Sequence, residues 1–235
     1  MTAHMEIEVR RELERVLRPG DILFTRLRNP MARKIADASA CWTNHVGIAF
    51  RDPQRGWVVA ESAVPLSRCG TLARFLRRSE SSSICVRRFA RGVTADEAAA
   101  LWRAAQARLG RLYHTGFDYH ASRQFCSKFV HDVYREAMGV EIGRKEMLRD
   151  LLQRNPDAPL NFWKLWYFGR IPWTRTTVTP ASQYESPLLT TVYERLPTTG
   201  LSPARKVVTS CSHTGRKSEV PLHFSLPVTA SAQTP

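Results

Sequence analysis

The chain has 235 residues, 43% of them hydrophobic and 24% charged, which is typical of a folded domain large enough to bury a reaction site. Its formal net charge is +14, and 29 of its 35 basic residues are arginine, a bias that a GC-rich genome produces without any anionic partner. No apolar run reaches the roughly 18 residues of a membrane span, and the N-terminus lacks the apolar core of an export signal, so we expect a cytoplasmic protein. Its five cysteines include no C-x-x-C pair, which argues against a disulfide framework or a common zinc module.

The first 90 residues predict a region rich in strands. Pro19-Gly20 ends an amphipathic N-terminal segment, and the clearest hairpin consists of two β-type runs on either side of the turn sequence RDPQRG. The helices expected here cover 5–17 and 71–78, and an Arg- and Ala-rich loop-and-helix segment follows residue 25 and ends at about residue 40. The strands expected cover 21–25, 45–50, 57–62 and 83–89.

The rest of the chain predicts helices separated by polar and aromatic loops. A capping box at Thr94 opens an Ala-rich helix that Gly110 ends, and a helix that begins at Cys126 is ended by Gly139. Further expectations are a helix over 144–153, an aromatic loop over 155–180 and a last short helix over 180–194. The domain organisation expected is an N-terminal helix (1–18), one domain (19–196) and a disordered, basic, Ser/Thr/Pro-rich tail (197–235).

Cys126 differs from the other cysteines because it stands at the start of a helix, directly after a polar loop. Unpaired N–H groups and the positive end of the helix dipole favour an anion there. Together with a nearby imidazolium, such a position lowers the pKa of a cysteine thiol from about 8.5 to roughly 3.5–7.5. A free cysteine is also often a small buried hydrophobe, and position alone leaves that alternative open.

A cysteine nucleophile needs a base, and His45 at the start of a predicted strand is the candidate. Gly47 and Ala49 share its face and leave room for the helix of Cys126. If Phe50 pairs with Gly56, His45 stands directly opposite Glu61, within reach of a carboxylate–imidazole bond. If Phe50 pairs with Trp57, Glu61 points away.

The sequence does not decide between these two hairpin registers, and it also leaves open an interpretation without catalytic roles for His45 and Glu61. In that interpretation, His45 is an ordinary histidine at the end of a strand, and Glu61 is a solvated charge. A metal site formed by His114, His120, Cys126 and His131 is conceivable, but its spacing matches no common zinc arrangement, so we expect no metal and no cofactor.

Four motifs in order, GDILF, NHVGIAF, VVAES and FCSKFV, resemble the permuted papain-like cysteine hydrolases of the NlpC superfamily, of the YiiX/YaeF type. In that group the histidine strand precedes the cysteine helix, as it does here. The resemblance runs from about Pro19 to Gly139 and implies an α+β fold, with a small antiparallel sheet or partial barrel packed on the cysteine helix. Two positions depart from the family's pattern, because Asn44 and Lys128 stand where Ser and Glu are usual. Lys128 would place a cation one turn from the thiol.

The resemblance implies that Cys126 is the nucleophile, His45 the base and Glu61 the residue that orients the base. The activity implied is that of a cysteine amidase, peptidase or acyl hydrolase/acyltransferase that forms a thioester. Gln124 or Tyr119 would complete the oxyanion site beside the Cys126 N–H. The expected partner is an amide- or ester-containing substrate, such as a peptide or an acyl lipid. Phe162–Trp173 would either line an acyl pocket or, more often, pack in the core.

A second hypothesis is an inactive papain-like scaffold that binds anionic lipid or nucleic acid through an arginine-rich face. Residues 61–92 carry seven arginines and two glutamates, and RFLRR with Leu72 and Phe75 could form a basic amphipathic helix lying on a membrane. The plainer interpretation, a helix with a solvated face, is preferred. No dedicated nucleic-acid motif is present, and only weak contact with an anionic surface is expected. No pattern in the sequence indicates an oligomeric state.

Overall fold

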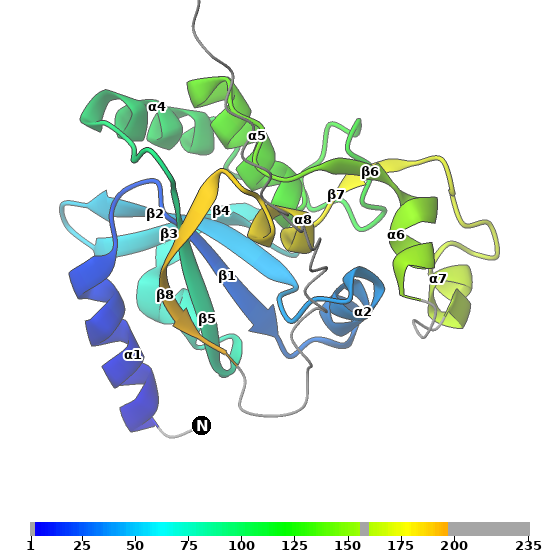
Figure 1. Cartoon of the computed structure of the whole chain (residues 1–235), viewed down its shortest axis with the longest axis horizontal. Helices are drawn as coiled ribbons and strands as arrows, with labels where there is room; N and C mark the ends of the chain where they lie inside the picture. The colour runs from blue at the N-terminus through cyan, green and yellow to red at the C-terminus, as the bar shows by residue number, and fades with distance from the viewer. Residues whose placement is uncertain (1–2, 156–159, 197–235) are drawn as a thin grey trace, which may run out of the picture. The chain divides into compact units, whose positions relative to one another are not determined.

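The computed structural model of the chain describes residues 3–155 and 160–196, and the tail predicted over 197–235 lies outside the described residues (Figure 1). Their architecture is α+β, as the sequence predicted. Among these residues no helix combines the length and apolar character needed to cross a membrane.

A six-stranded antiparallel sheet forms the centre of the domain. Its strand order is β4-β3-β2-β1-β5-β8, so the first five strands come from the first 90 residues and the last strand adds to the edge. The strands are β1 (Ile22–Leu27), β2 (His45–Asp52), β3 (Gly56–Ser62), β4 (Ser67–Thr71), β5 (Ser79–Phe89) and β8 (Leu189–Arg195).

Helices cover both faces of this sheet, because alternate strand residues are apolar on each side. On one face, Ile22, Val46 and Ile48 pack in one cluster with residues of α4 (Ala95–Gln106) and α5 (Cys126–Met138). On the other face, Leu23, Ala49 and Val59 pack with residues of α1 (Ala3–Val16) and α3 (Leu72–Leu76). The predicted cysteine helix therefore packs directly on the sheet.

A smaller group of elements lies beside the sheet, on the right of Figure 1. Buried Phe125, Leu151 and Trp163 belong to its apolar cluster, together with Ala38 from the helix after β1. The elements are α2 (Pro30–Ser39), β6 (Lys145–Met147), α6 (Leu148–Arg154), α7 (Leu160–Trp166) and β7 (Thr176–Val178). The short helix α8 (Pro180–Tyr184) lies nearer the centre of Figure 1, and its Tyr184 packs against the cluster of the sheet and α5.

Several predicted elements beyond residue 140 are wrong. The helix expected over 144–153 begins as β6, which pairs with β7 across about 30 residues of chain. The aromatic loop expected over 155–180 contains α7, which is free of proline because the four prolines of that segment lie outside it. The helix expected over 180–194 ends at Tyr184, and the β-branched run after Pro187 pairs with β5 as β8.

Candidate active site

The start of β2 is fastened to β1 by side chains that precede His45. Asn44 accepts a hydrogen bond from the Leu27 N–H at 2.7 Å and donates to the Leu27 carbonyl at 3.2 Å. The Thr43 hydroxyl donates to the Thr25 carbonyl at 2.9 Å. Because the side chains of Thr43 and Asn44 both bind β1, the backbone of the next residue, His45, has a defined position. His45 is buried, with only 3% of the residue exposed.

His45 and Glu61 form a buried pair, although neither of the two registers considered from the sequence is correct. Phe50 pairs with Val58, and continuing that register places Glu61 opposite Gly47, two positions from His45 on the same face. The side chains meet diagonally, with His45 Nε2 2.5 Å from Glu61 Oε2. The turn explains the shift, because Asp52 Oδ1 accepts two backbone N–H groups and the strands close with Asp52 opposite Gly56, which has φ of +73°.

Two arginines hold the Glu61 carboxylate on its other side. Arg78 Nη2 lies 2.6 Å from each carboxylate oxygen, and Arg68 Nε lies 3.2 Å from Oε1. Arg68 comes from β4, directly opposite Glu61. Burial alone would raise the pKa of Glu61, but the hydrogen bond and charge of His45, together with Arg78, hold it at about 2. The group is therefore a carboxylate at neutral pH.

An ionised carboxylate only accepts hydrogen bonds, so His45 Nε2 carries the proton shared with Glu61 and Nδ1 is left as the basic nitrogen. Burial alone would lower the pKa of His45. Hydrogen bonds to the Cys126 side chain and to Glu61 outweigh burial and raise that pKa above its usual value of 6.5. The imidazole therefore links the carboxylate to the thiol.

Cys126 is the first residue of α5 and is 3% exposed. Phe125, at the N-cap position, offers no side-chain hydrogen bond to the helix, so the N–H groups of the first turn remain open to another acceptor. The expectation that α5 packs on the face of Gly47 is wrong, because Phe75 of α3 packs near Gly47 and α5 packs on the opposite face. The Cys126 thiol meets His45 at the end of β2.

Tyr113 joins this group, and sequence reasoning missed it. The loop between α4 and α5 folds back on itself, since the His114 N–H donates to the Gln124 carbonyl at 2.7 Å and the Gln124 N–H donates to Leu112 at 3.1 Å. Tyr113 thereby comes close enough to Cys126 for both the sulfur and the backbone N–H of that residue to influence the pKa of its hydroxyl. Burial and the Cys126 sulfur raise the pKa of Tyr113 well above its usual value of 10, so its hydroxyl stays protonated and can donate.

Of the two residues predicted for the oxyanion site, Gln124 lies two residues before Cys126, whereas the Tyr119 hydroxyl binds further along α5. Gln124 is 1% exposed, and its side-chain oxygen has no hydrogen-bond partner in the described part of the chain. Tyr119 lies elsewhere, because its hydroxyl donates to Asp132 Oδ1 at 3.3 Å, in the second turn of α5. No sequence pattern separated Tyr113 from Tyr119, since only the closure of the loop does so.

Lys128 does not place a free cation beside the thiol. Its Nζ lies 2.5 Å from Asp132 Oδ2, one turn further along α5, and 5.3 Å from the centre of the Tyr119 ring. The charge is therefore compensated by a carboxylate and directed away from the start of the helix.

The other described cysteines are poorly suited to act as nucleophiles. Burial, as the largest effect, raises the pKa of Cys41 to about 11 and that of Cys85 to about 12. Burial also raises the pKa of Cys69. Cys211 lies outside the described residues.

The arginine-rich helix considered as a membrane-binding element is part of the wall behind His45. Leu72 and Phe75 are each 2% exposed and pack under the sheet, so α3 presents no free apolar face. The Phe75 ring lies 5.8 Å from the imidazole, centre to centre. Arg74 and Arg77 of this segment are exposed, so the structure matches the preferred interpretation of a solvated face.

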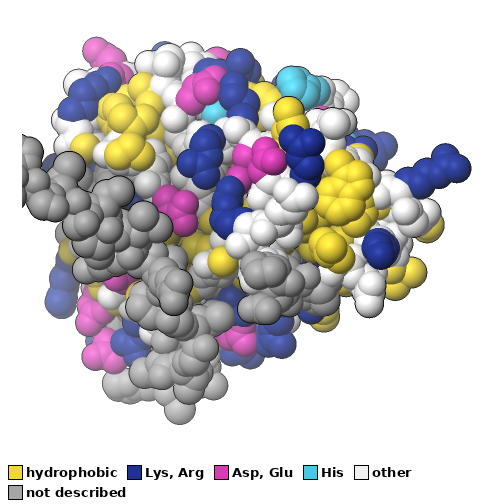
Figure 2. All heavy atoms as spheres, turned by 45° about the vertical axis from the view of Figure 1, so that its right-hand side comes forward, with side chains coloured by type: hydrophobic (Ala, Val, Ile, Leu, Met, Phe, Trp, Pro, Cys, Tyr) yellow, Lys and Arg dark blue, Asp and Glu magenta, His cyan; other side chains and the backbone are white. Residues whose placement is uncertain are grey.

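The aromatic segment Phe162–Trp173 divides between core and surface. Trp163 is 2% exposed, whereas Leu165 and Phe168 are 79% and 96% exposed and line a separate cavity of about 660 Å³. Figure 2 shows hydrophobic side chains gathered on the side of the molecule that carries α7. A different cavity opens onto His45.

The fold and the cysteine–histidine order define a circularly permuted papain-like protein of the cysteine hydrolase type. The chain belongs to the family described as "permuted papain-like amidase enzyme, YaeF/YiiX, C92 family", which matches residues 16–193. It is 28% identical over 178 residues to "Uncharacterized protein YiiX" of Escherichia coli K12, which covers 76% of this chain and 87% of that protein. Membership of an amidase family supports a hydrolase activity.

A solved structure shares the fold. The "crystal structure of metalloprotein yiiX from Escherichia coli O157:H7" superposes with a TM-score of 0.69 at 27% identity, over 77% of this chain and 99% of that one. Within residues 3–155 and 160–196 of the present chain, no group of three or more His, Cys, Asp or Glu side chains is arranged to hold a metal ion. The conceivable set of His114, His120, Cys126 and His131 is therefore not assembled in the described part of the chain.

Proposed function

We propose that the protein is a cysteine hydrolase that cleaves amides or esters through a thioester on Cys126. The observation that carries this proposal is the buried pair of His45 and Glu61, 2.5 Å apart, whose imidazole also interacts with the thiol at the uncapped start of α5. A cysteine, a base and a group that orients the base are the three parts that nucleophilic catalysis needs.

In the first half of the reaction, His45 Nδ1 takes the thiol proton and the sulfur attacks the carbonyl carbon. A C–S bond forms, and the carbonyl π electrons move to the oxygen. In this proposal the Cys126 N–H and the Tyr113 hydroxyl stabilise the charge on that oxygen, and the side-chain NH₂ of buried Gln124 is a further candidate donor. Collapse of the intermediate breaks the bond to the leaving group, which takes the proton from the imidazolium.

In the second half, water or another acceptor attacks the thioester. His45 removes the acceptor's proton, the C–S bond breaks and the sulfur recovers a proton. Glu61 remains ionised throughout, because His45 and Arg78 hold its pKa at about 2. Its role is to keep Nδ1 facing the thiol and to stabilise the imidazolium.

The test is alkylation by iodoacetamide between pH 5 and 9, resolved for each cysteine by peptide mass spectrometry. We expect Cys126 to react fastest below pH 8, and His45→Ala to slow that reaction. His120→Ala, at an exposed histidine, is the control and should change nothing. The same variants are then assayed with a p-nitrophenyl ester and an aryl amide, where Cys126→Ala should abolish turnover and His45→Ala should lower it by roughly 100-fold or more. Slow labelling of Cys126 with no effect of His45→Ala would refute the proposal.

A further inference from the structure

The cavity that opens onto the candidate site has a volume of about 390 Å³. His45 and Tyr113 line it, so it lies beside the two side chains that interact with the Cys126 thiol. One wall is apolar and comes from Met31, Ala32 and Ile35 of α2. A substrate held against Cys126 would extend into this space.

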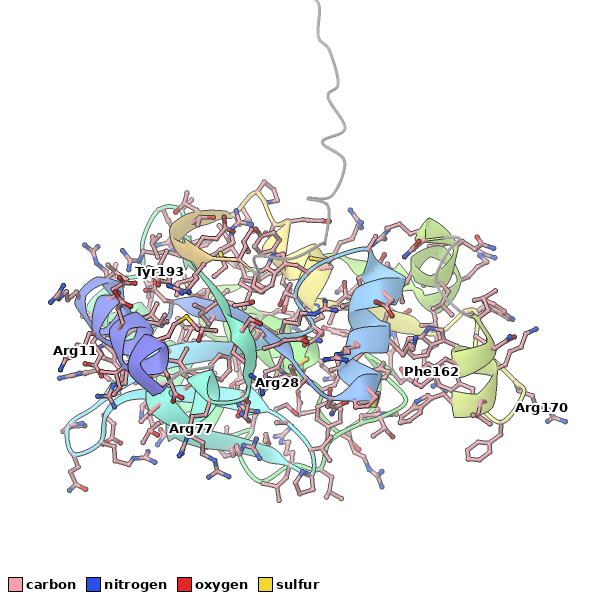
Figure 3. All side chains as sticks on the ribbon, turned by 90° about the horizontal axis from the view of Figure 1, so that it is seen from below. Arg11, Arg28, Arg77, Phe162, Arg170 and Tyr193 are labelled. Atoms are coloured by element: carbon pink, nitrogen blue, oxygen red, sulfur yellow. The ribbon has the colours of Figure 1, made fainter. Side chains whose placement is uncertain are left out.

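Four arginines also line the cavity, namely Arg28, Arg68, Arg77 and Arg78, and no acidic residue of the described chain does so. Arg68 and Arg78 bind Glu61, whose carboxylate is shared with His45. Arg28 and Arg77 have no ion pair with any residue in the described parts of the chain. In Figure 3 both are labelled, one from the loop before α2 and the other from the end of α3. The cavity therefore has two positive charges that no acidic residue in the described ranges compensates.

Guanidinium groups are planar donors whose geometry matches carboxylate and phosphate oxygens. A concave site lined by charges of one sign also concentrates ligands of the opposite sign. The α2 wall offers a surface for a short hydrocarbon segment between such an anion and the reacting carbonyl.

We propose that the substrate is an anionic amide or ester, whose carboxylate or phosphate group binds Arg28 and Arg77 while its carbonyl carbon faces Cys126. This inference rests on the proposed function and adds the charge of the substrate to it. The two arginines bind the substrate and take no part in the proton transfers of His45.

The test compares two alkylating agents of nearly the same shape, anionic iodoacetate and neutral iodoacetamide. Their rates at Cys126 are measured in the full-length protein at low ionic strength, and the iodoacetate/iodoacetamide ratio is divided by the ratio for N-acetylcysteine. We expect this normalised ratio to be roughly tenfold or more above one, and to fall when salt is added. Arg28→Gln combined with Arg77→Gln should reduce it to near one while the iodoacetamide rate stays unchanged, which shows that the site is still folded.

The control removes two positive charges elsewhere, by Arg11→Gln on α1 and Arg103→Gln on α4, both exposed. It should keep the high ratio. Competition distinguishes the two anion types, because protection of Cys126 from iodoacetate by inorganic phosphate at lower concentration than by acetate identifies a phosphate site, and the reverse identifies a carboxylate site. A normalised ratio near one in the wild type, or one that the double variant leaves unchanged, overturns the inference. If neither reagent labels Cys126, the proposed function fails as well, which is a distinct result.

Discussion

Glu61 receives hydrogen bonds from three side chains that come from three different parts of the fold. His45 is on β2, Arg68 is on β4, and Arg78 follows α3. The carboxylate is 4% exposed, so each of these interactions acts with little screening by water. The negative charge of Glu61 therefore orients the His45 ring and favours a proton on His45 Nε2.

Replacing Glu61 by Gln tests that role, because the amide has the same shape and no charge. We expect kcat/KM to fall by about 100-fold or more. Loss of the negative charge also lowers the pKa of His45, which Glu61 helps to raise, so the alkaline limb of the pH–rate profile should move to lower pH. Glu8→Gln on the exposed side of α1 is the matched control. A loss of activity without any displacement of the profile would argue against an electrostatic role.

Tyr113→Phe removes a single hydroxyl next to Cys126. If that hydroxyl stabilises the oxyanion, kcat should fall by about 10²–10³ while KM changes little. Alkylation of Cys126 by iodoacetamide, which forms no oxyanion, should continue at a similar rate. Tyr193→Phe, which removes a hydroxyl that bonds Glu12 on the other side of the sheet, serves as the control. An unchanged kcat would exclude Tyr113 from the mechanism.

At the scale of elements, the contact between α3 and β2 determines how well the candidate site is supported. Gly47 lies on β2 between His45 and Ala49, and an added Cβ would stand 2.6 Å from Val59 Cγ1 and 3.3 Å from Phe75 Cε2. Since β2 and β3 are both inside the sheet, neither backbone can easily move away. The missing side chain at this position is what allows α3 to pack against the strand that carries His45.

Gly47→Ala should therefore lower the free energy of unfolding by about 1–3 kcal/mol and reduce activity in the same variant. Gly70→Ala on β4, where the nearest atom to the added Cβ is the flexible Arg74 side chain at 3.5 Å, should have a much smaller effect. Urea denaturation provides the measurement. Combining Gly47→Ala with Val59→Ala should restore part of the stability relative to the sum of the single effects, and strict additivity would contradict the packing argument.

The sequence predicted the elements that carry Cys126 and His45, because their apolar periodicity and flanking Gly and Pro residues are local signals. It did not predict β4, since SRCGT has no strand pattern and forms a strand by pairing with β3. The hairpin register depended on a three-residue turn stabilised by Asp52, which composition alone does not specify. Tyr113 was missed for a similar reason, because its position follows from the closure of a loop rather than from spacing along the chain.

At the scale of the whole molecule, the buried carboxylate links acid stability to the candidate site. The pKa of Glu61 is lowered from 4.5 to about 2 in the folded state, so its contribution to stability is present above pH 4.5 and is lost as the pH falls towards about 2. The size of this contribution is on the order of 3 kcal/mol.

Thermal unfolding between pH 6 and 2 measures this effect. We expect a steep fall in the melting temperature of the wild type below pH 4.5. Glu61→Gln should be less stable at pH 6 and show a shallower dependence on pH over the same range. Parallel curves for the two proteins would mean that other carboxylates account for the acid transition.

The first helix and the last strand of the described domain lie next to each other. The Tyr193 hydroxyl of β8 donates to Glu12 of α1 at 2.6 Å, and Arg195 lies 2.9 Å from the sulfur of Met5 (Figure 1). A short peptide joining these two ends, with a new break in the turn between β5 and α4, would put the Cys126 helix ahead of the His45 strand without moving either. The order of His45 and Cys126 along the chain thus depends only on where the termini are placed. Genes related by circular permutation can therefore encode the same three-dimensional arrangement.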